Sequence, residues 1–445
     1  MRTTETPRYQ AYTLANMDSI RQLSRLSERR RHAMRATAHV LPFRVSNYVV
    51  DELIDWSDIP DDPIFQLTFP QPGMLGEVAV ARVGAALREG ASRKALQPLA
   101  NEIRLELNPH PAGQLEHNVP RLDGEPLPGL QHKYRDTVLF FPSRGQTCHS
   151  YCTYCFRWAQ FVGMEDLKFA QRETETFHRY LRRHDEVSDV LFTGGDPMIM
   201  RGWHLKAYVE PLLGRGFEHI RHIRIGTKVL AFWPYKFLTD PDADTVLRLF
   251  ESVVKSGKHL ALMAHFTHPR ELETEAVRKA IARIRATGAV IRTQAPLVRH
   301  VNDSVSAWVD MWSTQVNLGC IPYYMFVERD TGPKGYFEVP LADAHDLFRR
   351  AFRQVSGLAR TVRGPSMSAT PGKVVVLGTQ QVKGEKVFVL SFLRGRRQEW
   401  TGRPFFAKFD PKATWLDQLK PAFGERRFFY EEEAPVPVRK QVGWE

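Results

Sequence analysis

The sequence predicts an α/β fold, a partial (β/α)6 barrel of the TIM type with an N-terminal helical extension and a C-terminal β-hairpin and tail. Six short apolar runs alternate with longer helical patterns, which indicates a parallel sheet. Polar residues gather at the C-terminal ends of these runs, which favours a barrel, with a doubly wound open sheet as the alternative. The runs are 137–141, 189–195, 222–227, 261–266, 289–296 and 321–327.

The chain divides into three predicted regions. A long proline-rich connection ends near residue 130 and suggests a boundary there. The helical pattern over 270–288 ends in Gly288, as a helix C-cap should. The regions are 1–130, helical and loop; 131–345, the barrel; and 346–445, a C-terminal segment with a hairpin over 373–392.

Composition excludes several classes of protein. The 445 residues contain four cysteines, too few for a disulfide scaffold, and no apolar run approaches the roughly 18 residues of a membrane helix. The N-terminus has no apolar signal region, so we expect a cytoplasmic protein. The net charge of +12 raises the question of a nucleic-acid partner, but the basic runs 28–35 and 394–400 lack interleaved aromatic residues. We interpret these runs as solvated basic faces.

Three of the four cysteines lie within eight residues, at Cys148, Cys152 and Cys155. A zinc site usually takes four protein ligands, and the fourth cysteine, Cys320, is 165 positions beyond Cys155 (320 − 155). Three thiolates on a loop after a strand suit a [4Fe–4S] cluster that keeps one iron free of protein ligands. Cys320, before an apolar run, is predicted to be a core residue.

The spacing CxxxCxxC, with Tyr154 before the last cysteine, resembles the radical S-adenosylmethionine (SAM) signature. The resemblance implies that SAM binds the open iron and is cleaved to a 5′-deoxyadenosyl radical. At the end of the second run, Gly194 and Gly195 allow close backbone approach, and Asp196 adds a carboxylate. This stretch resembles the motif that binds the SAM amino group.

Over residues 50–410 the chain is similar to the lysine 2,3-aminomutase family. That family removes a hydrogen from an amino acid held on pyridoxal 5′-phosphate (PLP), and the amino group moves from C2 to C3. The resemblance implies a small amino-acid or carboxylate substrate, a flavodoxin- or ferredoxin-type electron donor and a homo-oligomer. The stretches that carry it are 59–71, 108–120, 132–141, the cysteine loop, 190–197, 224–228, 265–269, 294–303 and 322–326.

The resemblance also assigns roles to single residues. His265 and Gln294 match residues that contact SAM, and Tyr154 is expected to form a wall beside the adenine. Arg157 matches the arginine that holds the substrate α-carboxylate, a task that suits a guanidinium fork.

The PLP residues follow the family pattern in part. Lys373 resembles the lysine to which PLP is attached, although one glycine precedes it where the family has a run. Lys133 and Tyr134 stand where the family binds the phosphate. A third family phosphate arginine aligns with Thr137.

The substrate residues depart from those of the lysine-specific members, which hold the distal ammonium with two aspartates. The first aspartate aligns with Arg329, or with Asp330 if the register shifts by one, and the second falls near Arg363 or Ser366. Arginine repels an ammonium and attracts a carboxylate, so we expect a substrate other than lysine, acidic as for a glutamate 2,3-aminomutase. Because no cysteine follows Cys320, we expect no C-terminal zinc site.

Two other functions remain open from the sequence. One is a PLP-independent radical SAM enzyme of the same fold that performs a desaturation, dehydration or decarboxylation. The other, more distant, is a non-catalytic nucleic-acid-binding protein that uses the basic surface.

Overall fold

The computed structural model describes residues 7–111, 118–164, 169–171 and 174–432. Its central feature is a sheet of eleven strands in the order β15-β14-β13-β12-β11-β10-β9-β8-β7-β6-β5. Six neighbouring strands are parallel and follow chain order, and they confirm the six predicted runs: β6 (Thr137–Phe140), β7 (Asp189–Phe192), β8 (His222–Thr227), β9 (His259–His265), β10 (Val290–Leu297) and β11 (Ile321–Val327).

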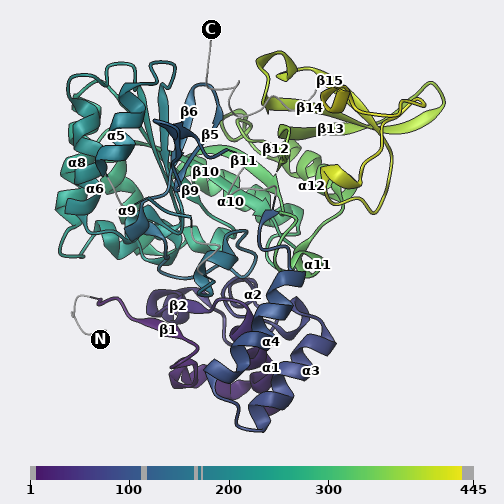
Figure 1. The fold of residues 1–445 in the computed structure, drawn as a ribbon. Coiled ribbons are helices and arrows are strands. Elements are labelled where there is room, and N and C mark those ends of the chain that lie inside the picture. Colours follow the sequence, from purple (N-terminus) through teal and green to yellow (C-terminus); the bar gives the residue numbers. More distant parts are fainter. Residues whose placement is uncertain (1–6, 112–117, 165–168, 172–173, 433–445) are drawn as a thin grey trace.

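Helices connect each of these strands to the next, and they lie along the sheet in Figure 1. A doubly wound sheet reverses its strand order at one point, whereas here the order never reverses. The doubly wound alternative is therefore excluded. The connecting helices are α5 (Thr174–Arg182), α6 (Gly202–Val209), α7 (Val229–Phe232), α8 (Ala243–Lys255), α9 (Glu275–Ala286) and α10 (Val305–Asn317).

Local sequence explains where these helices begin and end. The Thr274 side chain accepts a hydrogen bond from the Val277 amide and starts α9, and Ser304 does the same for α10. Gly288 follows α9 with a φ of +85°, a left-handed conformation that favours glycine, which confirms the expected stop.

The N-terminal region packs against one end of the sheet (Figure 1). The segment that follows residue 76 forms α3 and α4, and the proline-rich stretch 59–71 contains α2. Asp62 caps α2 and Pro63 is its first residue. The elements are β1 (Ala11–Thr13), α1 (Glu28–Val40), β2 (Arg44–Ser46), α2 (Pro63–Thr68), α3 (Glu77–Arg88), α4 (Arg93–Glu106), β3 (Arg121–Leu122), β4 (Glu125–Pro126) and β5 (Leu130–Tyr134).

The C-terminal region extends the sheet beyond β11. The predicted hairpin is confirmed as the antiparallel pair β13 and β14, and its apolar face forms a core of its own around Phe388, Leu390 and Trp415. Within the described ranges, none of the helices combines the length and apolar character that a bilayer crossing requires. The elements are α11 (Lys334–Phe337), α12 (Leu341–Gln354), β12 (Arg363–Ser368), β13 (Gly372–Val382), β14 (Glu385–Gly395), β15 (Pro404–Lys408) and α13 (Phe429–Glu432).

Candidate active site

The cysteine loop follows β6 and is held between the sheet and the N-terminal region. Thr153 donates its amide to Leu67 O at the end of α2, and its hydroxyl to Gln66 O. The Ser150 hydroxyl accepts the amide of Ser46 at 2.9 Å. The N-terminal region therefore fixes the backbone of the loop that carries the three cysteines.

The three thiols lie close enough to influence one another. Burial raises the pKa of Cys152 to about 12 and that of Cys155 to about 11, and the neighbouring cysteine thiolates add to the rise at Cys148 and Cys152. Three half-buried thiols whose ionised forms would repel one another are suited to a metal centre, because bound metal ions keep thiolates deprotonated. Cys320 is buried in the main core just before β11, as expected.

Gly194 and Gly195 follow β7 and touch the cysteine loop directly. A Cβ on Gly195 would lie 2.5 Å from the Thr147 amide nitrogen, closer than real Cβ atoms approach. A Cβ on Gly194 would lie 2.2 Å from Gln146 Nε2. These glycines therefore allow close packing against the cysteine loop, and their approach to a ligand stays a prediction.

Asp196 forms hydrogen bonds with the cysteine loop, with the end of β8 and with the turn after β7. Its amide donates to Thr147 O, and its carboxylate accepts hydrogen bonds from the Thr227 hydroxyl, the Lys228 amide and the Met198 amide. Burial raises the pKa of Asp196 to about 6, against the lowering effect of these hydrogen bonds. A role for Asp196 toward SAM stays a prediction.

A buried polar network that the sequence analysis missed lies beside Tyr154. The Tyr154 hydroxyl is 2.9 Å from Thr267 Oγ1, and Lys228 Nζ donates to the same Thr267 oxygen at 2.9 Å. Lys228 Nζ also lies 2.7 Å from a carboxylate oxygen of Glu271, whose side chain is fully buried. The network joins the cysteine loop to β8 and to the segment after β9. In the sequence, the feature that could have indicated this network is Lys228, which directly follows the third predicted run.

We expect Lys228→Met to lower the free energy of unfolding by about 3–5 kcal/mol, because it leaves the Glu271 carboxylate buried without its charge partner. The control is Lys279→Met, which breaks the exposed pair with Glu275 and should cost less than about 1 kcal/mol. Urea unfolding of both variants without cofactors checks the difference. Equal effects of the two substitutions would contradict it.

His265 and Gln294 are paired across neighbouring strands β9 and β10, near their C-terminal ends. The Gln294 amide donates to His265 Nε2 at 2.7 Å. Burial, with a smaller effect of Lys228, lowers the pKa of His265 to about 3, so the imidazole is neutral. The structure thus brings together two of the residues predicted to contact SAM.

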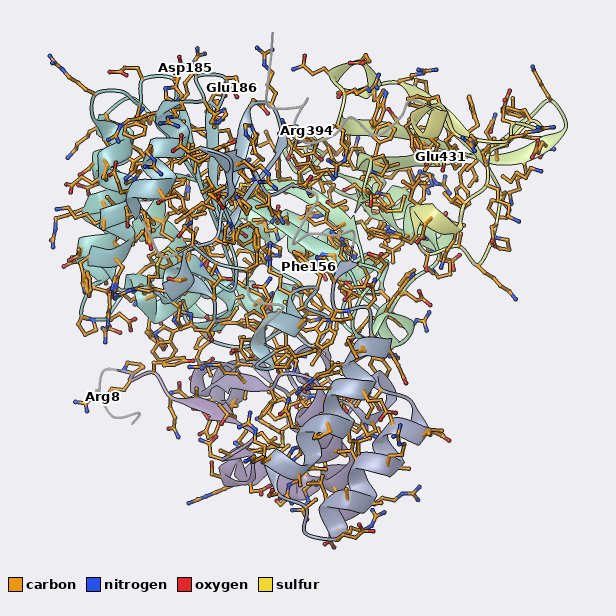
Figure 2. All side chains as sticks on the ribbon, in the orientation of Figure 1. Arg8, Phe156, Asp185, Glu186, Arg394 and Glu431 are labelled. Carbon is orange, nitrogen blue, oxygen red and sulfur yellow. The ribbon has the colours of Figure 1, made fainter. Side chains whose placement is uncertain are left out.

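Arg157 and Arg329 both lie close to the Phe156 ring, with guanidinium carbons 5.2 and 5.5 Å from its centre. Phe156 lies near the middle of the molecule (Figure 2). Burial lowers the pKa of Arg157 to about 10, helped by the charge of Arg329. Arg329 Nε and Asp330 Oδ1 form an ion pair at 3.5 Å, and neither atom makes a hydrogen bond in the described part of the chain.

Lys373 lies at the start of β13, above the rings of Tyr324 and Phe326 on β11. Its Nζ is 3.9 Å from the centre of the Tyr324 ring, and Arg363 stands 4.7 Å from the same ring. Burial, and then the charges of Arg224, Arg363 and Arg394, lower the pKa of Lys373 to about 7. Near neutral pH a large fraction of this amine is unprotonated, as a nucleophile requires.

Lys133 and Tyr134 lie at the end of β5, and Lys133 is close enough to Lys373 to be affected by its charge. The charges of Arg396, Arg329 and Lys373 help burial to lower the pKa of Lys133. The guanidinium of Arg394 stands 4.3 Å from the centre of the Tyr134 ring, pairs with Asp136 and donates to the Thr137 hydroxyl at 3.1 Å.

The sequence analysis did not identify Arg394 and Arg396 as site residues, because it interpreted the basic run 394–400 as a solvated face. In the structure, Arg394 stands at Thr137, the position at which the family pattern has an arginine. A strand far along the chain thus supplies a guanidinium at that place.

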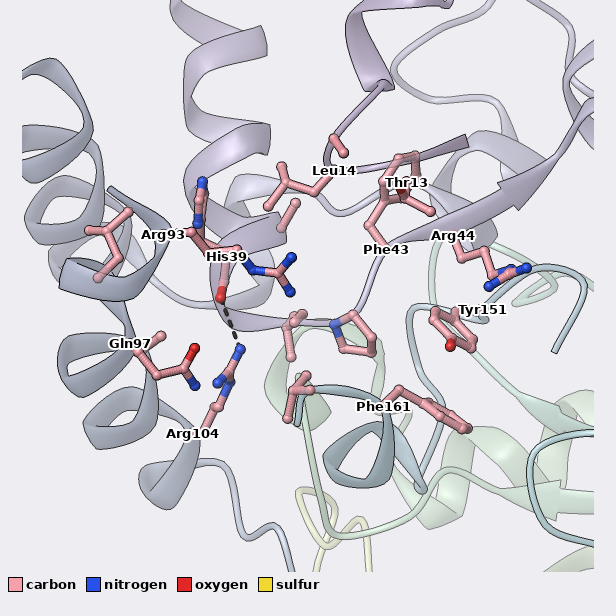
Figure 3. Close-up of a pocket in the computed structure, with 17 residues that line it drawn as sticks. Thr13, Leu14, His39, Phe43, Arg44, Arg93, Gln97, Arg104, Tyr151 and Phe161 are labelled. Atoms are coloured by element: carbon pink, nitrogen blue, oxygen red, sulfur yellow. Dashed lines mark hydrogen bonds between the residues drawn. The ribbon is translucent and has the colours of Figure 1, made fainter. Parts of the chain in front are cut away.

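A separate pocket of 270 Å³ lies between the N-terminal helices and the outer side of the cysteine loop (Figure 3). Arg44, Arg93 and Arg104 line it, with Tyr151 and Phe161 forming the wall toward the loop. None of the predicted site residues lines this pocket, so it is distinct from the arrangement above.

No protein-family model matches the chain. A putative L-lysine 2,3-aminomutase of Aquifex aeolicus is 36% identical over 290 residues, which cover 65% of this chain and 74% of that protein. The chain belongs to the lysine 2,3-aminomutase family. The L-lysine 2,3-aminomutase of Escherichia coli is 29% identical over 250 residues, 55% of this chain and 68% of that protein.

Solved structures align weakly with this family member. A radical SAM methyltransferase from Sphaerobacter thermophilus has 15% identity and a TM-score of 0.36, covering 53% of this chain and 68% of that one. This similarity is too low to inform the fold.

Membership implies a radical SAM enzyme with a [4Fe–4S] cluster and SAM, and the residues present fit both groups. The donor set is three half-buried thiols on one loop, without a fourth cysteine beside them in the described part of the chain. Such a set leaves one iron for SAM.

Proposed function

We propose that the chain is a PLP-dependent amino-acid 2,3-aminomutase whose substrate is acidic rather than lysine. The cluster and SAM supply a 5′-deoxyadenosyl radical that abstracts hydrogen, and PLP carries the migrating amino group. Cys148, Cys152 and Cys155 would hold the cluster, with Tyr154, Gly194, Gly195, Asp196, His265 and Gln294 around SAM.

The observation that carries the PLP assignment is the Lys373 amine, whose pKa is lowered to about 7 beside Tyr324. Lys133, Tyr134 and Arg394 surround it with cationic and hydroxyl groups that suit a phosphate. Lys373 would hold PLP covalently, and the other three would bind the phosphate.

The acidic substrate is supported by the guanidinium pair at Phe156. Arg157 would orient the α-carboxylate, and Arg329 would hold a side-chain carboxylate in place of its ion pair with Asp330. At about 4 Å, each charge contact is worth about 1–4 kcal/mol, attractive for an acidic side chain and repulsive for a cationic one. Asp330 and Arg363 would adjust this selectivity.

The fold supports this arrangement. We propose that the six sequential parallel strands curve into a partial barrel that excludes water from the radical step. The division at residues 130 and 345, a flavodoxin- or ferredoxin-type donor and a homo-oligomeric state also belong to the proposal.

Anaerobic reconstitution with and without PLP tests the function. With L-glutamate deuterated at C3, we expect deuterium in 5′-deoxyadenosine and a β-amino acid product only when PLP is present. Rapid isomerisation of lysine would contradict the substrate assignment. Turnover without PLP would favour the PLP-independent radical SAM alternative.

We expect Arg329→Gln to raise KM for the acidic substrate about 10–100-fold, because one charge-assisted hydrogen bond is worth about 1.5–3 kcal/mol. Arg349→Gln is the control, since Arg349 is exposed on α12 and pairs with Asp346. The measurement is the steady-state KM of both variants, with the acidic substrate that the reconstitution experiment identifies. An unchanged KM in Arg329→Gln would exclude it as a substrate residue.

A further inference from the structure

His132, His184 and Glu186 form a cluster of metal-ligating side chains away from the cysteine loop. One ring nitrogen of each histidine and one carboxylate oxygen all lie within 4.8 Å of one another. His132 belongs to β5, and the other two lie in the connection between α5 and β7. Glu186 is at the end of the sheet opposite the N-terminal helices (Figure 2).

Hydrogen bonds already hold the members of this cluster close together. His184 Nδ1 is 2.8 Å from Glu186 Oε1, a hydrogen-bond distance. His132 Nδ1 is 2.6 Å from the Tyr180 hydroxyl, while Nε2 is 3.0 Å from Arg135 O. An ion bound through Nε2 would replace the hydrogen bond to Arg135 O, while Tyr180 would continue to orient the ring through Nδ1.

A bound ion would need small shifts of these atoms. Ligands about 2.1 Å from a tetrahedral zinc ion lie about 3.4 Å apart, so the His184–Glu186 contact of 2.8 Å would open slightly, while wider separations within the 4.8 Å limit would close by up to about 1.4 Å. His184 and Glu186 lie in a connection between elements, and 14% and 18% of their side chains remain exposed, so small rotations can close the set.

We propose that His132, His184 and Glu186 bind one divalent first-row cation of the zinc type, with water as the remaining ligand. Two imidazoles and a carboxylate are a donor set that zinc takes in proteins. The ion would join β5 to the connection before β7. Because Lys133 and Tyr134 follow His132 on β5, it would also hold these two residues in place.

The test uses the reconstituted full-length protein, incubated with zinc and then desalted. Zinc and iron are counted separately by mass spectrometry, and the zinc X-ray absorption edge reports the ligand atoms. We expect one tightly held zinc per chain, with nitrogen and oxygen ligands alone. His184→Ala and Glu186→Gln should each weaken zinc binding by about 100-fold or more, while the iron content stays unchanged.

His222→Ala is the matched control, since this exposed histidine lies beside His259 and outside the cluster. It should retain the zinc. The proposal is overturned if the wild-type chain retains no zinc, if both cluster variants retain it, or if the edge shows sulfur ligands, which would place the ion on the cysteines. These readouts need no turnover, so they are independent of the proposed aminomutase activity.

Discussion

Replacing Cys148, Cys152 or Cys155 by serine is expected to abolish reductive SAM cleavage, with a loss of at least about 1,000-fold in rate. The three thiols are the ligands that the loop offers, and without one of them the open-iron arrangement cannot form. Iron and sulfide analysis after anaerobic reconstitution, together with 5′-deoxyadenosine formation, measures the effect. The loss should be equal for the three positions, because each ligand is needed for the same cluster.

Cys320→Ala is the internal control for these variants. Cys320 is buried in the core before β11, and its removal should cost about 1 kcal/mol of stability without altering iron content. Iron retained by all three loop variants, or lost only from the Cys320 variant, would be incompatible with the assignment. The comparison separates cluster ligation from a general effect of removing a buried thiol.

Much of the sheet could be predicted because its signals are local. Each parallel strand is a short apolar run, and residues such as His265 and Gln294 stand near strand ends where parallel strands meet at one edge. The hydrogen bond between these two side chains was not predicted. The bounds of α2 were not predicted either, although Asp62 and Pro63 form an ordinary helix start.

The rest depends on contacts between distant parts of the chain. Arg394 and Thr137 are 257 positions apart, and no local pattern indicates that a basic run near the C-terminus reaches the start of β6. The Lys228–Glu271 pair likewise joins two connections on neighbouring strands. Such contacts can be predicted only when the strand order is known. The sequence therefore identified the charged residues but not their partners.

Lys373→Ala is expected to eliminate covalent PLP attachment. In the free protein, burial and the charges of Arg224, Arg363 and Arg394 lower the pKa of Lys373 to about 7, and the neutral amine is the form that attacks an aldehyde. Attachment should therefore increase as pH rises through about 7, well below the 10.4 of an ordinary lysine. Borohydride reduction followed by peptide mass spectrometry locates the label, and its yield against pH gives the titration.

Lys133 is the competing amine, because burial and neighbouring cations lower its pKa as well. Its Nζ donates to Ala369 O at 2.7 Å, which engages it with the backbone next to the Lys373 turn. We therefore expect Lys133→Ala to weaken PLP binding while the label stays on Lys373. Lys373→Arg should retain the positive charge without attachment. A label on Lys133 in the wild-type chain, or attachment that begins only above pH 9, would show that Lys373 is not the PLP lysine.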